Sequence, residues 1–300
     1  MSTKQKILIT GCGGMLCQAF YEVFTPDFEV LATDIDLNAS WLKELDVRDY
    51  DQFRNVVEFF RPDYIFHLAA LTDLEFCEQN PEEAYRTNAL GTENSALLAK
   101  KFGATLIYIS TAGIFDGKKD LYDDYDQPNP LNHYGRAKYA GEVFVQNYCD
   151  KFFVFRAGWM MGGGSKDKKF IKKIIQQIQS GKKELFVVND LQGTPTYTYD
   201  FANNVREMIQ TNFYGVYNMV CSGETSRLEV AKEILNVLKL TDQVKINEVS
   251  SSYFAKEYFV RRPDSEKLIN RKLILRNMNK MRDWRIGLKE YLERDWLDKI

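Results

Sequence analysis

The chain has little of what marks a membrane protein, a secreted protein or a nucleic-acid-binding protein. Its 300 residues contain no apolar run of about 18 residues, the length that a transmembrane helix needs. The apolar stretch near the start, Ile7 to Thr10, is too short for a signal peptide. The net charge is −2 and no basic block occurs, so neither nucleic acid nor an anionic membrane is an expected partner. We expect a cytoplasmic protein.

Cysteine and metal-ligating patterns are also scarce. The five cysteines lie at positions 12, 17, 77, 149 and 221, and none forms a C-x-x-C pair. This scatter predicts free thiols in a reducing cytosol. No cluster of ligating residues has a recognisable metal-binding spacing, so no metal is predicted. His67 lies within an apolar run, and there a core histidine is favoured over a catalytic one.

A glycine-rich turn near the N-terminus is the first positive signal. An apolar strand, Lys6 to Thr10, leads into Gly11-Cys12-Gly13-Gly14, and an apolar-periodic helix then runs to Phe24. Strand, glycine turn and helix form the context of a dinucleotide-binding loop. Gly11 and Gly14 would let the backbone approach a pyrophosphate, and Met15 and Leu16 would open a helix N-terminus with free N–H groups. The alternative is a tight turn that binds no ligand.

Acidic residues after the next strand indicate which dinucleotide would bind. The strand Glu29 to Thr33 ends at Asp34, 20 residues after Gly14. A carboxylate there accepts hydrogen bonds from adenosine ribose hydroxyls and repels a 2′-phosphate, which favours NAD(H) and leaves NADP(H) possible. Asp46 and Val47 are expected to bracket the adenine, although a loop aspartate can also be a simple helix cap.

Two later strands supply small and hydroxylic residues. The stretch from Tyr64 to Ala70 reads as a strand, and the cofactor residues predicted at its end are Leu68, Ala69, Ala70 and Thr72. The strand Thr105 to Ile109 delivers Ser110 and Thr111. Because the carboxyl ends of parallel strands meet at one edge of a sheet, these residues should line one crevice.

Tyr134 and Lys138 form a pair four residues apart on a predicted helix. That spacing places both side chains on one face. An ammonium beside a phenol is predicted to lower the pKa of Tyr134 and so make it a proton donor near neutral pH. Among 17 tyrosines the pair could occur by chance, but it follows the glycine loop, Asp34 and Thr111 in the order that one sheet would present them.

Together these motifs resemble the extended short-chain dehydrogenase/reductase superfamily, and more closely the dTDP-4-dehydrorhamnose reductase family. The resemblance covers nearly the whole chain. It is carried by Gly11-x-x-Gly14, His67 to Thr72, Cys77-Glu78-x-Asn80-Pro81-Glu82, Asn88-Ala89-x-Gly91-Thr92, Ser110-Thr111, Phe115-Asp116-Gly117, Pro130-Leu131-Asn132-x-Tyr134-Gly135-x-x-Lys138, Gly141-Glu142, Phe155-Arg156-x-x-Trp159, Gln192 to Thr198 with Asp200, Arg262-Pro263 and Asp283-Trp284-Arg285. Two positions depart from the family: Cys17 replaces the third glycine, and Ala112 stands where an aspartate is usual.

The resemblance implies an α/β fold, a Rossmann-type doubly wound parallel sheet with a smaller α/β substrate-binding region. The NAD(P)-binding domain would cover residues 1–157, with a returning segment at about 193–220. The substrate-binding region would cover residues 158–192 and 221–300. A homodimer is expected by resemblance.

The resemblance also implies an activity, NAD(P)H-dependent reduction of the 4-keto group of a nucleotide-linked 4-keto-6-deoxysugar, in the biosynthesis of cell-surface polysaccharide. Tyr134 would donate the proton, Lys138 would hold the nicotinamide ribose, and Thr111 would hydrogen-bond the reacting oxygen. The residues expected at the substrate are Thr111, Ala112, Trp159 and Arg262. Ala112-Gly113 supplies no acid pair, which argues against a dehydratase. A nucleotide-sugar epimerase, a non-catalytic NAD(P)-binding regulatory subunit and a redox-sensing NAD-binding protein remain alternatives.

Overall fold

A seven-stranded, wholly parallel sheet forms the centre of the larger part of the molecule. The computed structural model describes residues 4–299. The strand order is β11-β6-β5-β4-β1-β2-β3, so the chain crosses from one side of β1 to the other between β3 and β4. The strands are β1 (Lys6–Thr10), β2 (Glu29–Asp34), β3 (Lys43–Glu44), β4 (Tyr64–His67), β5 (Thr105–Thr111), β6 (Phe152–Ala157) and β11 (Gly215–Asn218). This is the predicted Rossmann-type architecture.

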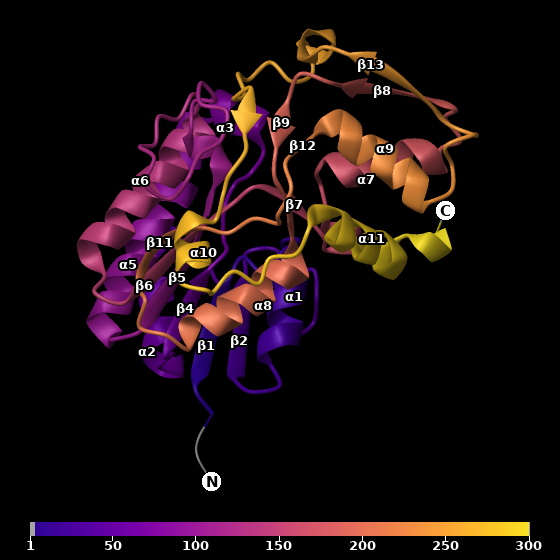
Figure 1. Cartoon of the computed structure of the whole chain (residues 1–300). Helices are drawn as coiled ribbons and strands as arrows, with labels where there is room; N and C mark the ends of the chain where they lie inside the picture. Colours follow the sequence, from indigo (N-terminus) through magenta and orange to yellow (C-terminus); the bar gives the residue numbers. More distant parts are fainter. Residues whose placement is uncertain (1–3, 300) are drawn as a thin grey trace.

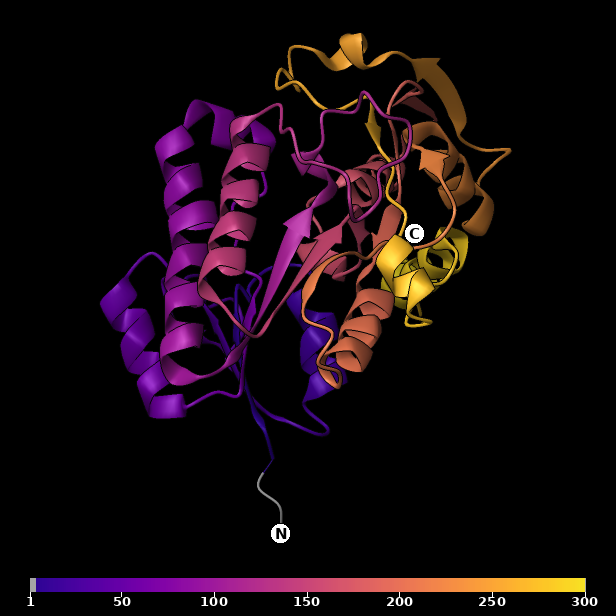
Figure 2. The same cartoon turned by 60° about the vertical axis from the view of Figure 1, so that its left-hand side comes forward.

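Helices cover both faces of the sheet. Figures 1 and 2 show α2, α5 and α6 on one face and α1 and α8 on the other. Their bounds are α1 (Cys17–Phe24), α2 (Tyr50–Phe60), α5 (Gly91–Phe102), α6 (His133–Tyr148) and α8 (Thr198–Ile209). A strand that is buried on both faces has a continuous apolar sequence, and Ile7, Leu8 and Ile9 accordingly have no exposed surface.

Shorter helices connect β4 to α5, and a second group of elements lies beside the sheet. The connecting helices are α3 (Leu74–Gln79), α4 (Pro81–Tyr85) and a π-helical turn at Arg86–Leu90. On the right-hand side of Figure 1 lie α7 (Phe170–Gln179), α9 (Arg227–Val237) and α11 (Trp284–Asp295), with β8 (Glu184–Val188) paired to β13 (Lys245–Val249). The other strands and α-helix are β7 (Trp159–Met161), β9 (Gln192–Gly193), β10 (Pro195–Tyr197), β12 (Thr225–Ser226), β14 (Ser265–Glu266) and α10 (Arg271–Leu275). Short 3-10 helices lie at Ala112–Ile114, Gly164–Lys166, Ser251–Phe254 and Leu297–Lys299. None of the helices within residues 4–299 is long and apolar enough to cross a bilayer.

The structure confirms most predicted elements and moves some of their ends. Asp49 caps α2, because its carboxylate accepts a 2.9 Å hydrogen bond from the N–H of Gln52. The strand predicted to reach Ala70 is shorter, since β4 ends at His67. Conversely, β5 extends beyond Ile109 to Thr111. His67 is a satisfied core residue: its ring nitrogens contact the hydroxyls of Thr10 at 2.9 Å and Thr92 at 3.2 Å.

The expectation of five free thiols is wrong. Cys12 and Cys17 form a disulfide across the glycine-rich turn, whereas Cys77, Cys149 and Cys221 are free and buried. Sequence spacing could not indicate this bond, because the turn folds back on itself and brings the two Cα atoms to 4.8 Å.

The disulfide predicts a thiol count that alkylation can check. In denaturant without reductant, iodoacetamide should modify three of the five cysteines. After reduction it should modify all five. Mass spectrometry gives the count, and peptide mapping should place the two protected sulfurs at Cys12 and Cys17. Modification of all five before reduction would contradict the bond.

Candidate active site

The glycine loop and Asp34 meet at the carboxyl edge of the sheet, where β1 and β2 end. The Asp34 carboxylate accepts a 2.7 Å hydrogen bond from the N–H of Gly13 and a 2.8 Å hydrogen bond from the N–H of Asp36. A β-carbon on Gly13 would lie 2.9 Å from Asp34 Cγ, so a larger residue there would displace the carboxylate. The predicted ribose acid therefore contacts the predicted pyrophosphate loop.

The start of α1 is open to an anion. No side chain caps this helix, and its first turn contains no acidic residue. Within residues 4–299 the N–H groups of Met15 and Leu16 donate no hydrogen bond. Free N–H groups at a helix N-terminus form an anion site. The loop therefore fits a dinucleotide pyrophosphate through the free N–H groups of Met15 and Leu16, whereas the N–H of Gly14 donates to the carbonyl of Gly11.

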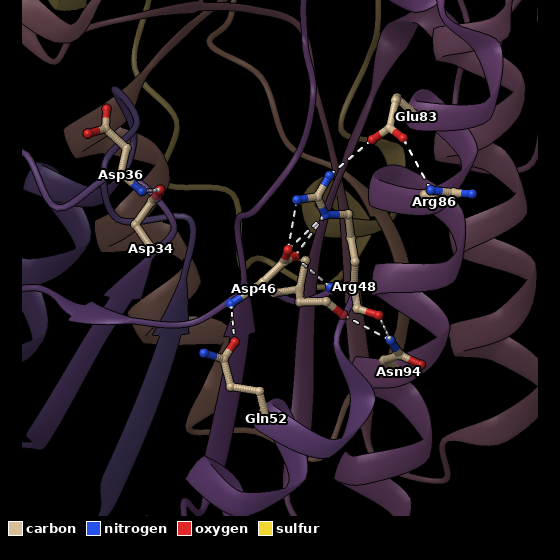
Figure 3. A network of polar contacts seen from close by, with 9 residues as sticks. Asp34, Asp36, Asp46, Arg48, Gln52, Glu83, Arg86 and Asn94 are labelled. Carbon is tan, nitrogen blue, oxygen red and sulfur yellow. Dashed lines mark hydrogen bonds and ion pairs between the residues drawn. The ribbon is translucent and has the colours of Figure 1, made fainter.

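The predicted adenine residues lie one strand further along the edge. Figure 3 shows Asp46 engaged by Arg48, whose guanidinium also contacts Glu83 at 3.0 Å. The Arg48 hydrogen bonds are the main reason that the pKa of Asp46 is lowered. Val47 is buried and packs against Gly91, where a β-carbon would lie 2.9 Å from its methyl group. Asp46 is thus held by an ion pair, and Val47 belongs to the wall behind it.

The segment after β4 packs tightly under the glycine loop. A β-carbon on Gly11 would lie 2.4 Å from the backbone nitrogen of Ala69 and 2.7 Å from the carbonyl carbon of Leu68. This close approach, with a φ of +78°, accounts for glycine at position 11. Ala70 follows on the same segment. The Thr72 carbonyl and hydroxyl accept hydrogen bonds from Lys169 at 2.9 and 3.1 Å, so Thr72 is bound by the second group of elements.

The predicted catalytic residues come from the end of β5 and the start of α6. Asn132 caps α6 by accepting a 2.9 Å hydrogen bond from the N–H of Gly135. A β-carbon on Gly135 would lie 2.4 Å from the carbonyl oxygen of Gly113. The absence of that carbon lets the helix start approach the end of β5, which brings Tyr134 beside Thr111. The hydroxyl of Thr111 also accepts a 3.1 Å hydrogen bond from the N–H of Gly113.

The prediction that Tyr134 has a lowered pKa is wrong. Burial raises the pKa of Tyr134 to about 12, and the nearby Thr111 hydroxyl opposes this only in part. The ammonium of Lys138 lies 4.2 Å from the centre of the Tyr108 ring, over its face. Desolvation therefore sets the pKa of Tyr134, and the lowering expected from Lys138 is not found. Tyr134 is a protonated phenol at neutral pH, the form that can donate a proton to a developing alkoxide.

Lys138 is the group in this cluster that titrates near neutral pH. Burial lowers its pKa to about 7, opposed by the carboxylate of Glu142 one turn along the helix. Glu142 itself is held in a buried ion pair with Arg156 at 2.8 Å. The other polar neighbours, Tyr108 and His67, are neutral, because burial raises the pKa of Tyr108 and lowers the pKa of His67 to about 3.

The pKa of Lys138 predicts how kcat/KM for the expected ketone reduction depends on pH. If the ammonium form of Lys138 is needed, kcat/KM should be constant below about pH 7 and fall tenfold per pH unit above it. The direction follows because raising the pH removes the proton from the ammonium. The measurement is kcat/KM from pH 5.5 to 9. A rise above pH 7 would contradict this role.

Two of the residues predicted to bind substrate, Trp159 and Arg262, come from other segments of the chain, and each is hydrogen-bonded to a carboxylate. The Trp159 Nε1–H donates a 2.6 Å hydrogen bond to Glu266. The guanidinium of Arg262 pairs with the Glu75 carboxylate at 2.8 and 2.9 Å, so its charge already has a partner. Ala112 is buried beside Thr111 and offers only a methyl group.

Sequence reasoning missed three charged residues at this place, namely Lys169, Arg227 and Glu266. The Arg227 guanidinium lies 3.7 Å from the centre of the Trp159 ring. Burial lowers its pKa to about 10, while the carboxylate of Glu266 opposes that shift. Glu266 follows the Arg262-Pro263 motif closely, which was a usable signal. No sequence signal pointed to Arg227 or Lys169, since each lies in a charged stretch typical of a solvated surface.

Comparison with known proteins shows which family the chain belongs to. The family described as RmlD substrate binding domain has a sequence model that matches residues 5–296. The chain belongs to this family. A relative, the dTDP-4-dehydrorhamnose reductase of Escherichia coli (strain K12), is 31% identical over 246 residues, which cover 79% of this chain and 81% of that protein. Another, methionine adenosyltransferase 2 subunit beta of Danio rerio, is 29% identical over 244 residues, covering 79% and 75%.

A solved structure extends the family likeness to the whole fold. The crystal structure of dTDP-4-dehydrorhamnose reductase from Bacillus anthracis in complex with NADP superposes with a TM-score of 0.89 at 32% identity. The superposition covers 97% of this chain and 99% of that one. The seven-stranded sheet and the elements beside it are therefore arranged as in an experimentally solved reductase of the family.

Proposed function

We propose that the protein reduces the 4-keto group of a nucleotide-linked 4-keto-6-deoxysugar with a nicotinamide dinucleotide. One observation carries the proposal: Tyr134 and Thr111 meet at the same sheet edge as the glycine loop, whose helix start has no side-chain cap, and Asp34, which contacts that loop. A proton donor beside a dinucleotide loop is what ketone reduction requires. The family relatives named as dTDP-4-dehydrorhamnose reductases support this choice of sugar.

In the proposed reaction the protein supplies the proton, the orientation and the stabilisation of charge. The reduced dinucleotide supplies the hydride when it is bound. Tyr134 donates its phenolic proton to the ketone oxygen as that oxygen becomes an alkoxide. The Thr111 hydroxyl hydrogen-bonds the same oxygen. The Lys138 ammonium holds the cofactor ribose and adds positive charge to the site.

A group of cations beside the site supports a diphosphate-bearing substrate. Lys169, Arg227 and Arg262 lie close together: burial and the charge of Arg227 lower the pKa of Lys169, and burial and the charge of Arg262, which also pairs with Glu75, lower that of Arg227. Lys173 adds a fourth charge, with its ammonium 2.6 Å from the hydroxyl of Tyr258. Arginine and lysine side chains pair well with phosphate oxygens. We place the nucleotide diphosphate over this group.

NADH is the preferred cofactor in this proposal, and Asp34 sets the preference. In Asp34→Asn, kcat/KM with NADH should fall about 10- to 100-fold, because a hydrogen bond to a charged group contributes about 1.5–3 kcal/mol. With NADPH it should rise, since the repulsion of the 2′-phosphate is gone. Initial rates with both cofactors give the ratio. A wild-type preference for NADPH would contradict the role of Asp34.

A substrate panel tests the activity itself. Nucleotide-linked 4-keto-6-deoxysugars with thymidine or uridine diphosphate are mixed with NADH, and its absorbance is followed. Stoichiometric oxidation with at least one sugar is the expected result. An epimerase would hold its cofactor through purification and consume none. A regulatory subunit would bind dinucleotide without turnover, and either outcome would overturn the proposal.

A further inference from the structure

Glu266 places a carboxylate at the reactive end of the site from a distant part of the chain. It ends β14, which pairs in parallel with β9, so that Glu266 lies opposite Gly193. One carboxylate oxygen, Oε2, accepts the 2.6 Å hydrogen bond from Trp159 Nε1–H. In the described part of the chain the other oxygen, Oε1, accepts no hydrogen bond. This second oxygen can therefore accept a hydrogen bond from a ligand.

The free oxygen lies in the same small region as the rings and hydroxyls of the catalytic pair, Tyr134 and Thr111. A β-carbon on Gly113 would lie 3.5 Å from Thr111 Oγ1, 3.7 Å from Tyr134 Cε1 and 3.7 Å from Glu266 Oε1. All three groups therefore surround one small volume. The negative charge of Glu266 also helps to raise the pKa of Tyr134, a shift that is due mainly to burial. Glu266 thus lies close to where the ketone must sit.

The carboxylate is held in place from several directions. A β-carbon on Gly193 would lie 2.3 Å from the Trp159 ring, so the indole packs directly on the strand backbone. Arg227 lies over the same ring at 3.7 Å. Trp159, fixed by these contacts, fixes Oε2 in turn. An acceptor held in one orientation before the ligand arrives loses little freedom when the ligand binds.

We propose that Glu266 selects the sugar by accepting, at Oε1, a hydrogen bond from the hydroxyl group on the carbon next to the reacting ketone. This inference rests on the proposed function and names the substrate class more narrowly: a 4-keto sugar with a hydroxyl at carbon 3. Tyr134 and Thr111 hold the ketone oxygen, so an acceptor beside them reaches the neighbouring carbon. Ala112 supplies no acceptor from the strand end, which leaves this task to Glu266.

A carboxylate is well suited to this selection. When ionised it only accepts hydrogen bonds, so it binds a hydroxyl and gains nothing from a C–H group. A site built to bind a substrate hydroxyl strongly rejects the analogue that lacks it, because the site's polar group is then left without a partner. Glu266 therefore acts as a specificity-determining residue rather than as a proton donor.

Glu266→Gln isolates the free oxygen. Glutamine keeps the size of the side chain and an oxygen for the Trp159 N–H, but its remaining group is an NH2 donor. kcat/KM is measured with NADH for two dTDP-linked 4-keto-6-deoxysugars, one with a hydroxyl at carbon 3 and one without. The wild type should prefer the hydroxyl form by about 100-fold or more. In Glu266→Gln the preference should shrink to about tenfold or less, through loss of the hydroxyl form alone.

A matched control and a binding measurement complete the test. Glu224→Gln removes an exposed carboxylate that pairs with neighbouring Lys267, and it should leave the preference unchanged. Dissociation constants for the two corresponding dTDP-6-deoxysugars, measured by calorimetry, decide the role of Glu266 even if turnover is absent. Absence of turnover in the wild type would overturn the proposed function alone. An unchanged preference, or equal losses with both sugars in Glu266→Gln, would overturn the role of Glu266.

Discussion

Tyr134→Phe should lower kcat by about 10³-fold, within the range of about 10²–10⁴ that a positioned general acid contributes. The substitution removes one oxygen from a partly buried ring in the first turn of α6, so the fold should be kept. Because the wild-type pKa of Tyr134 is about 12, the phenol is fully protonated in the assay, and its loss cannot be offset by lowering the pH. Stopped-flow or steady-state NADH oxidation measures the change.

Cofactor binding separates this chemical role from a structural one. The dissociation constant for NADH should stay within about threefold, since it depends mainly on the glycine loop and Asp34. Tyr125→Phe is a matched control, because Tyr125 is 64% exposed and lies outside the site. Full activity in Tyr134→Phe would show that the proton comes from another group.

Lys138→Met should lower kcat/KM by about 10²- to 10³-fold, the effect expected when one preorganised charge-stabilising donor is removed. Unlike Tyr134→Phe, it should also weaken NADH binding. Methionine fills a similar volume without the charge. Burial of the Lys138 ammonium destabilises the folded state, and the same desolvation lowers its pKa to about 7. The melting temperature should therefore be maintained or raised.

The pH profile gives a second readout for Lys138. The fall of kcat/KM above pH 7 should vanish in Lys138→Met, because the titrating group is absent. Lys101→Met is the control: it also removes a lysine charge from a helix but lies at the end of α5, away from the site. If the bend near pH 7 remained in Lys138→Met, another group would be responsible for it.

The sheet and the cofactor loop were predictable because their signals are local. An apolar run bounded by glycines gives β1 and its turn, and the spacing to Asp34 follows from the length of one helix and one strand. Tyr134 and Lys138 lie one helical turn apart, so their shared face is fixed by geometry alone. Each of these predictions needs only residues that are near neighbours in the sequence.

The other wall of the site depends on contacts between distant segments, which a single sequence does not reveal. Glu266 meets Trp159 across 107 positions, and Arg262 meets Glu75 across 187. Nor could the sequence reveal how deeply Tyr134 and Lys138 are buried, and burial decides both pKa values. The sequence suggested that Lys138 would lower the pKa of Tyr134, whereas desolvation, which sets both pKa values, depends on the folded structure.

Transfer of an isotopic label tests the central claim most directly. The protein is mixed with NADH deuterated at carbon 4 of the nicotinamide on either face, together with a dTDP-linked 4-keto-6-deoxysugar, and the product is analysed by NMR. The account predicts one deuterium on carbon 4 of the sugar from one of the two labelled cofactors, with one NADH consumed per product. Product formed without label from either cofactor, or NADH left unconsumed while the sugar changes, would contradict it.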